Sequence, residues 1–259
     1  MNLGLIKTAG LITKTTKYGD SSLIVTIITK DLGKISAIAN NVRTSKSRML
    51  SGLQLFVYSE FVVYKGKGKK GLYNINEITV AEAFPDIRTS LEKLAYASYF
   101  AEIANCVSTE NSPDVDILRL LLNSLFVLDR GLQPYEKIKT VFEWRLAHIC
   151  GYSPLIEHCG NCQCSDSLCG ISLSDGTALC QNCLPASPSS VKLSEPMLKI
   201  IEYISNSDDK KLFSFDAKRS VINYLSRVSE LYIKTQLDQD FSTLSYLKNV
   251  TSMEDKNEK

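Results

Sequence analysis

The chain has 259 residues, of which 44% are hydrophobic, and its formal net charge at pH 7 is +2. This composition is ordinary for a globular protein and excludes a wholly disordered chain. No apolar run reaches the roughly 18 residues that a membrane-spanning helix requires, and the start of the sequence lacks the continuous apolar segment of a signal peptide. We therefore expect a cytoplasmic protein without membrane contact, whose eight cysteines are reduced thiols.

The small net charge hides an uneven distribution along the chain. Residues 1–80 hold ten lysines, two arginines and four acidic residues, a net charge of +8, so the remainder carries −6. The stretch NNVRTSKSRML, residues 40–50, concentrates this charge, with Arg43, Lys46 and Arg48 and no acid. A solvated polar loop explains one such stretch, but the excess over 80 residues indicates a part that binds a polyanion.

The first 80 residues have the pattern of β-strands separated by turns. LIVTIITK is rich in β-branched residues and lies between YGDS and DLGK, two stretches with typical turn composition. KISAIAN follows as a third strand, and the long run at residues 53–64 and GLYNINEITV at residues 71–80 complete a set of five. Five short strands without helical periodicity predict a small barrel or sandwich.

After residue 84 the apolar residues recur with the period of a helix. A capping box at residues 89–92 and the pair Ser112-Pro113 predict the starts of two helices, and Pro134 opens a third that ends near Ile149. Two more are predicted at residues 194–205 and 216–237, with Cys106 and Cys150 as small core residues of the helical part. Residues 248–259 lack an apolar partner set and are expected to form a disordered tail.

Six of the eight cysteines lie in CGNCQCSDSLCGISLSDGTALCQNC. Cys159 and Cys162 form one C-x-x-C knuckle and Cys180 and Cys183 a second, and two such knuckles suit one tetrahedral zinc ion. A set of packed or redox-active thiols is the alternative. Cys164 and Cys169 lie between the knuckles with irregular spacing, so we interpret them as additional thiols, although either could replace a ligand.

No residue pattern indicates catalysis. Four thiolates leave no open position on a zinc ion, and His148 and His158 are the only histidines. The stretch KGKGKKG, residues 65–71, lacks the order of a phosphate-binding loop and joins two predicted strands, where such a loop needs a following helix. We therefore expect a structural metal ion and no enzymatic activity.

Three parts of the sequence resemble the RecO family of bacterial recombination mediators: TKYGDSSLIVTIITKDLGKISAIANNVRTSKSRMLSGLQLF, then SLEKLAYASYFAEIAN, then the paired knuckles. The resemblance continues to LDQDFSTLSYL near the end of the chain. It implies an N-terminal OB-fold and a helical domain that, in many members, carries a four-cysteine zinc site. It further implies binding to single- and double-stranded DNA, annealing of complementary strands, work with RecR, and help for RecA in replacing single-strand-binding protein. The expected location is the nucleoid of the bacterial cytoplasm.

These observations give one set of expectations. The fold is α+β, with a five-stranded OB-fold barrel at residues 1–80 and an all-helical domain at 81–247 that carries an inserted zinc knuckle at 155–186. The metal ligands for one structural Zn²⁺ are Cys159, Cys162, Cys180 and Cys183. Phosphates of DNA are expected to contact Lys34, Arg43, Lys46, Arg48, Lys65, Lys67, Lys69 and Lys70.

Two further expectations concern the barrel surface and its occupants. Phe56, Tyr58 and Tyr64 are candidates for stacking against bases. The alternative function is a protein-interaction adaptor, in which the basic barrel docks acidic partners or the helical domain grips an acidic peptide tail, such as that of single-strand-binding protein, and DNA contact is incidental.

Overall fold

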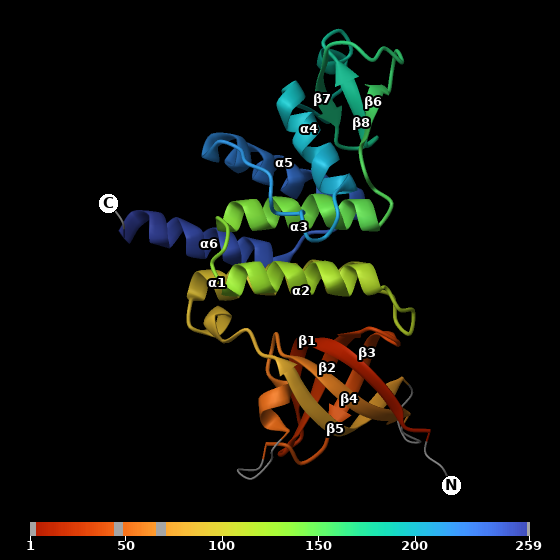
Figure 1. The fold of residues 1–259 in the computed structure, drawn as a ribbon, viewed down its shortest axis with the longest axis vertical. Helices are drawn as coiled ribbons and strands as arrows, with labels where there is room; N and C mark the ends of the chain where they lie inside the picture. The colour runs from red at the N-terminus through yellow and green to blue at the C-terminus, as the bar shows by residue number, and fades with distance from the viewer. Residues whose placement is uncertain (1–3, 44–48, 66–70, 258–259) are drawn as a thin grey trace. The chain divides into compact units, whose positions relative to one another are not determined.

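The structure is a computed structural model that describes residues 4–43, 49–65 and 71–257, with side chains described to residue 253. The chain divides into two compact units. Unit 1 comprises residues 1–130 together with 241–259, and unit 2 comprises residues 131–240. Figure 1 shows the elements of both units. No helix in the described ranges combines the length and apolar character needed to cross a bilayer.

Unit 1 begins with a closed five-stranded barrel. The strands are β1 (Ile6–Tyr18), β2 (Ser22–Thr29), β3 (Gly33–Ala39), β4 (Tyr58–Lys65) and β5 (Leu72–Glu82), in the order β1-β2-β3-β5-β4. All neighbours are antiparallel except β3 and β5, which run parallel, and β4 closes the barrel against β1. This mixed five-stranded barrel confirms the predicted OB-fold.

Every second side chain of these strands points into the barrel, because successive side chains of a strand point to opposite faces. Val25 and Ile27 of β2 lie in the interior beside alternate residues of β3 and β4, all with at most 2% of their surface exposed: Ile35, Ala37, Ala39, Phe61 and Val63. Of the intervening residues, Ile24 and Thr26 of β2 and Lys34, Ser36 and Ile38 of β3 are half-buried on the outer face, and Ile28 is buried.

The predicted strand at residues 53–64 begins later than expected. A 3-10 turn occupies Leu50–Leu53, and β4 starts only at Tyr58. Between them Phe56 adopts a left-handed backbone conformation with φ of 62°, which interrupts an extended chain. Its backbone N–H donates to the carbonyl of Ile12 at 2.9 Å, and its ring is buried with 1% exposure. The apolar residues of this stretch are therefore buried in a tight turn. A buried strand and a buried turn are both apolar, so composition did not distinguish them.

Three helices complete unit 1: α1 (Leu91–Val107), α2 (Val115–Asp129) and α6 (Ser242–Asn257), with a 3-10 turn at Pro85–Arg88 before them. The caps lie one or two residues later than predicted, at Ser90 for α1 and Asp114 for α2. Helix α1 packs against α2, α6 and β1, so its buried residues surround the helix and are not limited to one stripe. Cys106, predicted in the core, is exposed.

Helix α6 differs from the expected disordered tail. It continues to Asn257 and packs on α1, burying Leu244, Leu247 and Val250 to 4% exposure or less. These three residues recur at intervals of three, a pattern that is short enough to be missed in a polar sequence.

Unit 2 contains α3 (Tyr135–Ile149), α4 (Glu195–Asn206) and α5 (Arg219–Leu237), close to the predicted ranges. It also contains a small sheet that the sequence did not indicate. Its strands are β6 (Leu155–Cys159), β7 (Leu168–Ser172), β8 (Thr177–Cys180) and β9 (Ser190–Lys192), in the order β6-β8-β7-β9, with a 3-10 turn at Leu184–Ala186 between β8 and β9. The α+β class is confirmed, but the metal segment is a sheet with two knuckles and not an insertion into helices alone.

Candidate metal centre and nucleic-acid interface

The four predicted metal ligands lie together at one edge of the small sheet. Strands β6 and β8 are parallel neighbours, so both end at the same edge. Cys159 is the last residue of β6 and Cys180 the last of β8, and each is followed by a turn that carries the second cysteine of its knuckle. The Sγ atoms of Cys159, Cys162, Cys180 and Cys183 all lie within 4.8 Å of one another.

Backbone amides around the cluster favour thiolates. Burial raises the pKa of Cys159, but hydrogen bonds from the backbone N–H groups of Cys162, Cys180 and Asn161 outweigh it and lower the pKa to about 6. The backbone N–H of Cys183 is the main cause of a lowered pKa at Cys180. Hydrogen bonding to the Cys180 thiol raises the pKa of Cys183 to about 12. The lowered pKa values of Cys159 and Cys180 favour the charged form of these thiols, which suits the binding of a metal ion.

The donor set fits a soft, tetrahedral metal ion. Sulfurs about 2.3 Å from a zinc ion are about 3.8 Å apart at tetrahedral angles. The Sγ atoms of Cys162 and Cys180 are 3.7 Å apart, which matches one edge of such a tetrahedron. Four thiolates satisfy the coordination of the ion, so the centre has no open position for a substrate.

Two more cysteines lie near the knuckles. Cys164 is half-buried, and its Sγ is 3.4 Å from that of Cys162. Hydrogen bonding to the Cys162 and Cys180 thiols raises its pKa to about 12. Cys169 lies in β7 and is half-buried. The four-thiol group therefore has the composition that the knuckle spacing predicts, with one further thiol directly beside it.

The predicted phosphate contacts differ in their surroundings. Arg43 is exposed, its backbone N–H donates to Ser21 at 2.9 Å, and its guanidinium donates to the Gly19 carbonyl at 3.4 Å. These bonds hold the connection after β3 beside the β1–β2 turn. Lys65 is exposed at the end of β4, with its Nζ 5.7 Å from the ring centroid of Tyr73. Lys46, Arg48, Lys67, Lys69 and Lys70 lie outside the described residues.

Lys34 has a different environment from that expected of a phosphate contact. It is half-buried, and its Nζ donates to the backbone carbonyl of Asn105 in α1 at 2.8 Å. The side chain of Asn105 in turn accepts from Thr13 of β1 at 2.8 Å. Lys34 thus helps to hold the barrel against α1, and only part of its hydrogen-bonding capacity remains for a ligand.

Four exposed lysines of the barrel were missed in the sequence: Lys7, Lys14, Lys17 and Lys30. The polar stretch TKTTK, residues 13–17, gave the signal, because it follows the apolar run of the same strand and its residues from Lys14 onward are exposed or half-buried. In the part of the chain that the structure describes, none of the six exposed barrel cations (these four, Arg43 and Lys65) takes part in an ion pair. Their charge is therefore available to an external anion.

Lys14 begins a row of paired residues across the outer face of the barrel. It pairs with Thr26 of β2, Thr26 pairs with Ser36 of β3, and Ser36 pairs with Leu72 of β5. Paired residues in a sheet point to the same side, so Lys14, Thr26 and Ser36 form a short polar strip with a cation at one end, and Leu72 follows at the other. In OB-folds this face, with the β1–β2 and β4–β5 loops, is the one that receives oligonucleotides.

The three candidate stacking rings are less suitable than predicted. Phe56 is buried, so it offers no surface to a base. Tyr58 and Tyr64 are half-buried. Burial is the main cause of a raised pKa at Tyr58, and the nearby charges of Glu60 and Asp31 raise it further. The prediction for Phe56 is wrong, because its ring is buried. Tyr58 is a poor stacking ring, because the acids near it repel phosphate.

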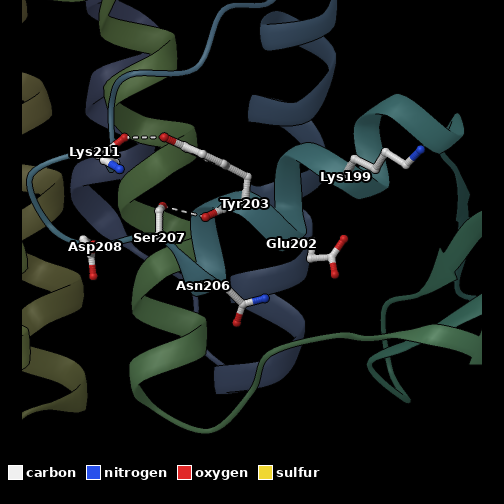
Figure 2. Close-up of a pocket in the computed structure, with 7 residues that line it drawn as sticks. All are labelled: Lys199, Glu202, Tyr203, Asn206, Ser207, Asp208 and Lys211. Atoms are coloured by element: carbon white, nitrogen blue, oxygen red, sulfur yellow. Dashed lines mark hydrogen bonds between the residues drawn. The ribbon is translucent and has the colours of Figure 1, made fainter.

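Unit 2 has an open hollow at the end of α4, shown in Figure 2, with a volume of about 510 Å³. Tyr203 donates from its hydroxyl to the carbonyl of Lys211 at 2.7 Å, and Ser207 donates to the carbonyl of Tyr203 at 2.6 Å. Lys199, also on its wall, pairs with Glu195 at 2.6 Å. None of these contacts joins a nucleophile to a base.

Similarity to known proteins extends over nearly the whole chain. The family model described as "Recombination protein O N terminal" matches residues 1–84, and "Recombination protein O C terminal" matches residues 88–245. The chain is 38% identical over 250 residues to the DNA repair protein RecO of Acetivibrio thermocellus, covering 96% of this chain and 98% of the relative. It is 33% identical over 244 residues to the RecO of Caldicellulosiruptor saccharolyticus, with 94% and 98% covered. A barrel with unpaired cations, a helical part with four clustered cysteines and these full-length similarities show that the chain belongs to the RecO family of DNA repair and recombination proteins.

Proposed function

We propose that the protein is a non-enzymatic recombination mediator that binds single- and double-stranded DNA through the phosphate backbone. In this role it anneals complementary strands and helps to load RecA onto DNA covered by single-strand-binding protein. The observation that carries the proposal is the set of exposed barrel cations without ion pairs, in a part of the sequence with a net charge of +8. Screening the charge of two strands at once lowers their repulsion, which is a physical reason for annealing.

The proposed interface is the barrel, within residues 1–80. Arg43 with Lys46 and Arg48 would contact phosphates from the loop after β3, and Lys65, Lys67, Lys69 and Lys70 would do so from the β4–β5 hairpin. Lys14 of β1 extends this set along the outer face, and Lys17, which is also exposed, lies near the end of the same strand. Lys34 contributes least, because its ammonium already donates to Asn105. Backbone contact of this kind does not depend on base sequence.

The proposed cofactor is one structural Zn²⁺, held by Cys159, Cys162, Cys180 and Cys183. When bound, the ion supplies cross-linking of the two knuckles and no reactive position. The support is the four-thiol donor set at the common end of β6 and β8.

The proposed partners, apart from DNA, are RecR, the acidic C-terminal tail of single-strand-binding protein and, indirectly, the RecA filament. They come from membership of the family, and the proposed location is the nucleoid of the bacterial cytoplasm.

Fluorescence anisotropy of labelled single strands tests the DNA proposal. We expect Arg43→Ala/Arg48→Ala to bind two unrelated sequences more weakly by the same factor. The slope of log affinity against log salt should become shallower by about 0.7 for each phosphate that the variant no longer neutralises. The matched control is Lys210→Ala/Lys211→Ala, which removes the same charge from exposed positions of unit 2 and should leave the slope unchanged.

Unchanged affinity and slope in Arg43→Ala/Arg48→Ala would contradict the role of this loop. Absence of DNA binding by the wild-type chain, together with binding to an acidic peptide, would instead favour the adaptor function.

A further inference from the structure

A fifth sulfur lies against one edge of the four-cysteine centre. The Sγ of Cys164 is 3.4 Å from that of Cys162. The backbone fixes this position, because the N–H of Cys159 donates to the carbonyl of Cys164 at 2.8 Å. Gln163, between the two neighbouring cysteines, has a left-handed conformation with φ of 63°, which turns the chain back toward the knuckle.

Cys164 is more shielded than the ligand beside it. Cys162 is exposed, whereas Cys164 is half-buried. Cys164 packs on the small buried cluster formed by Cys159, Leu179 and Cys180, to which Cys162 does not belong. Cys162, the predicted ligand, is therefore more accessible to a reagent in solution than Cys164.

Only one of the two sulfurs can occupy a corner of a closed tetrahedral site. Ligands about 2.3 Å from one zinc ion are about 3.8 Å apart, which is longer than the separation of Cys162 and Cys164. The two sulfurs are therefore alternatives for one position, next to Cys180 in either case.

We propose that Cys164 is an exchangeable ligand that takes the place of Cys162. The centre then keeps four thiolates, from Cys159, Cys164, Cys180 and Cys183, when Cys162 is lost or chemically blocked. This inference rests on the proposed metal centre and extends its ligand set by a residue of this chain.

Metal titration of single-cysteine variants of the full chain tests the exchange. The probe is Co²⁺, whose thiolate charge-transfer absorption increases with the number of bound thiolates, and affinity is measured by competition with a chelating dye. The variants are Cys162→Ser, Cys164→Ser and Cys162→Ser/Cys164→Ser. Cys183→Ser is the matched control, because Cys183 is also the second cysteine of a knuckle and its Sγ lies within 4.8 Å of those of the other three ligands.

We expect Cys162→Ser to keep the four-thiolate spectrum with affinity within about tenfold of wild type. Cys183→Ser and the double variant should show a three-thiolate spectrum and lose more than about 100-fold, beyond the effect of an outer-shell group. A three-thiolate spectrum in Cys162→Ser, equal to that of the double variant, would overturn the exchange. A wild-type chain that binds no Co²⁺ or Zn²⁺ would contradict the metal centre itself, so the two failures are distinguishable.

A measurement on an otherwise intact centre covers the case in which a variant misfolds. The metal-loaded Cys106→Ser chain, which lacks one exposed thiol outside the centre, is treated with limiting N-ethylmaleimide and analysed by native mass spectrometry and peptide mapping. Chains modified at Cys162 should retain one metal ion. Loss of the metal from every chain modified at Cys162 would overturn the proposal.

Discussion

The carboxylate of Glu102 in α1 caps the start of α6. It accepts hydrogen bonds from the backbone N–H and hydroxyl of Ser242, at 3.3 and 2.9 Å, and from the backbone N–H of Thr243 at 2.9 Å as well as its hydroxyl. Burial raises the pKa of Glu102, but these hydrogen bonds together lower it below its ordinary value. A negative charge at a helix N-terminus also complements the helix dipole.

We expect Glu102→Gln to lower the free energy of unfolding by about 1 kcal/mol at pH 7. The folded-state pKa lies below the unfolded value of about 4.3, so the contribution is fully present above that pH and is lost as the pH falls through the folded pKa. Urea unfolding at pH 7 and pH 3 measures it, with the exposed Glu202→Gln as control. An equal loss at both pH values would contradict the charge-dependent cap.

Single residues show where sequence reasoning stops. The type of residue was sufficient to find Cys159, Cys162, Cys180 and Cys183, because chelation requires thiols at a fixed spacing. It was insufficient for Lys34 and Phe56, since neither charge nor aromatic character reveals the direction of a side chain. Lys34 points to a helix carbonyl, and Phe56 enters the core from a left-handed turn.

At the scale of elements, the metal segment has little apolar material of its own. Its buried cluster around the knuckles consists of Cys159, Leu179 and Cys180 with partly buried neighbours. Strands of three to five residues cannot hold such an edge together alone. We therefore expect the ends of β6 and β8 to depend on the proposed ion, which would link their knuckles.

We expect chelation to increase amide hydrogen exchange in residues 155–186 and to lower the melting temperature, because metal binding is coupled to local folding. The barrel strands of unit 1 serve as the internal control and should exchange at the same rate with and without metal. Unchanged exchange in residues 155–186 after complete metal removal, or unchanged melting, would contradict the structural role.

Elements were predictable where they were long and their apolar pattern was periodic, whereas α6, with 16 residues in a polar stretch, was missed. Helices α3, α4 and α5 were found within a few residues, because 12 to 19 residues give several turns of periodic pattern. Strands β6 to β9 were missed, and β6 shows why: four of its five residues are exposed or half-buried, so no alternation is visible. Their pairing comes from contacts between distant segments and not from local preference.

At the scale of the whole molecule, unit 1 is built from two segments that lie far apart in the sequence, residues 1–130 and 241–259. Helix α6 packs on α1, and the rings of Phe241 and Tyr99 lie 6.0 Å apart edge to face. The predicted boundary at residue 80 marks a change from a strand pattern to a helix pattern in the sequence. The two compact units instead depend on contacts between segments that are more than 100 residues apart in the chain. The uneven charge, by contrast, was visible directly, since it needs only the order of residues.

Cross-link mapping tests most directly whether the barrel is where a polynucleotide binds. A single strand substituted with iodouracil is irradiated with the full-length protein, and the attached peptides are identified by mass spectrometry. We predict cross-links within residues 6–82, at the same positions for two unrelated base sequences, and their loss in Arg43→Ala/Arg48→Ala. Cross-links confined to residues 131–240, with none in the barrel, would contradict the account.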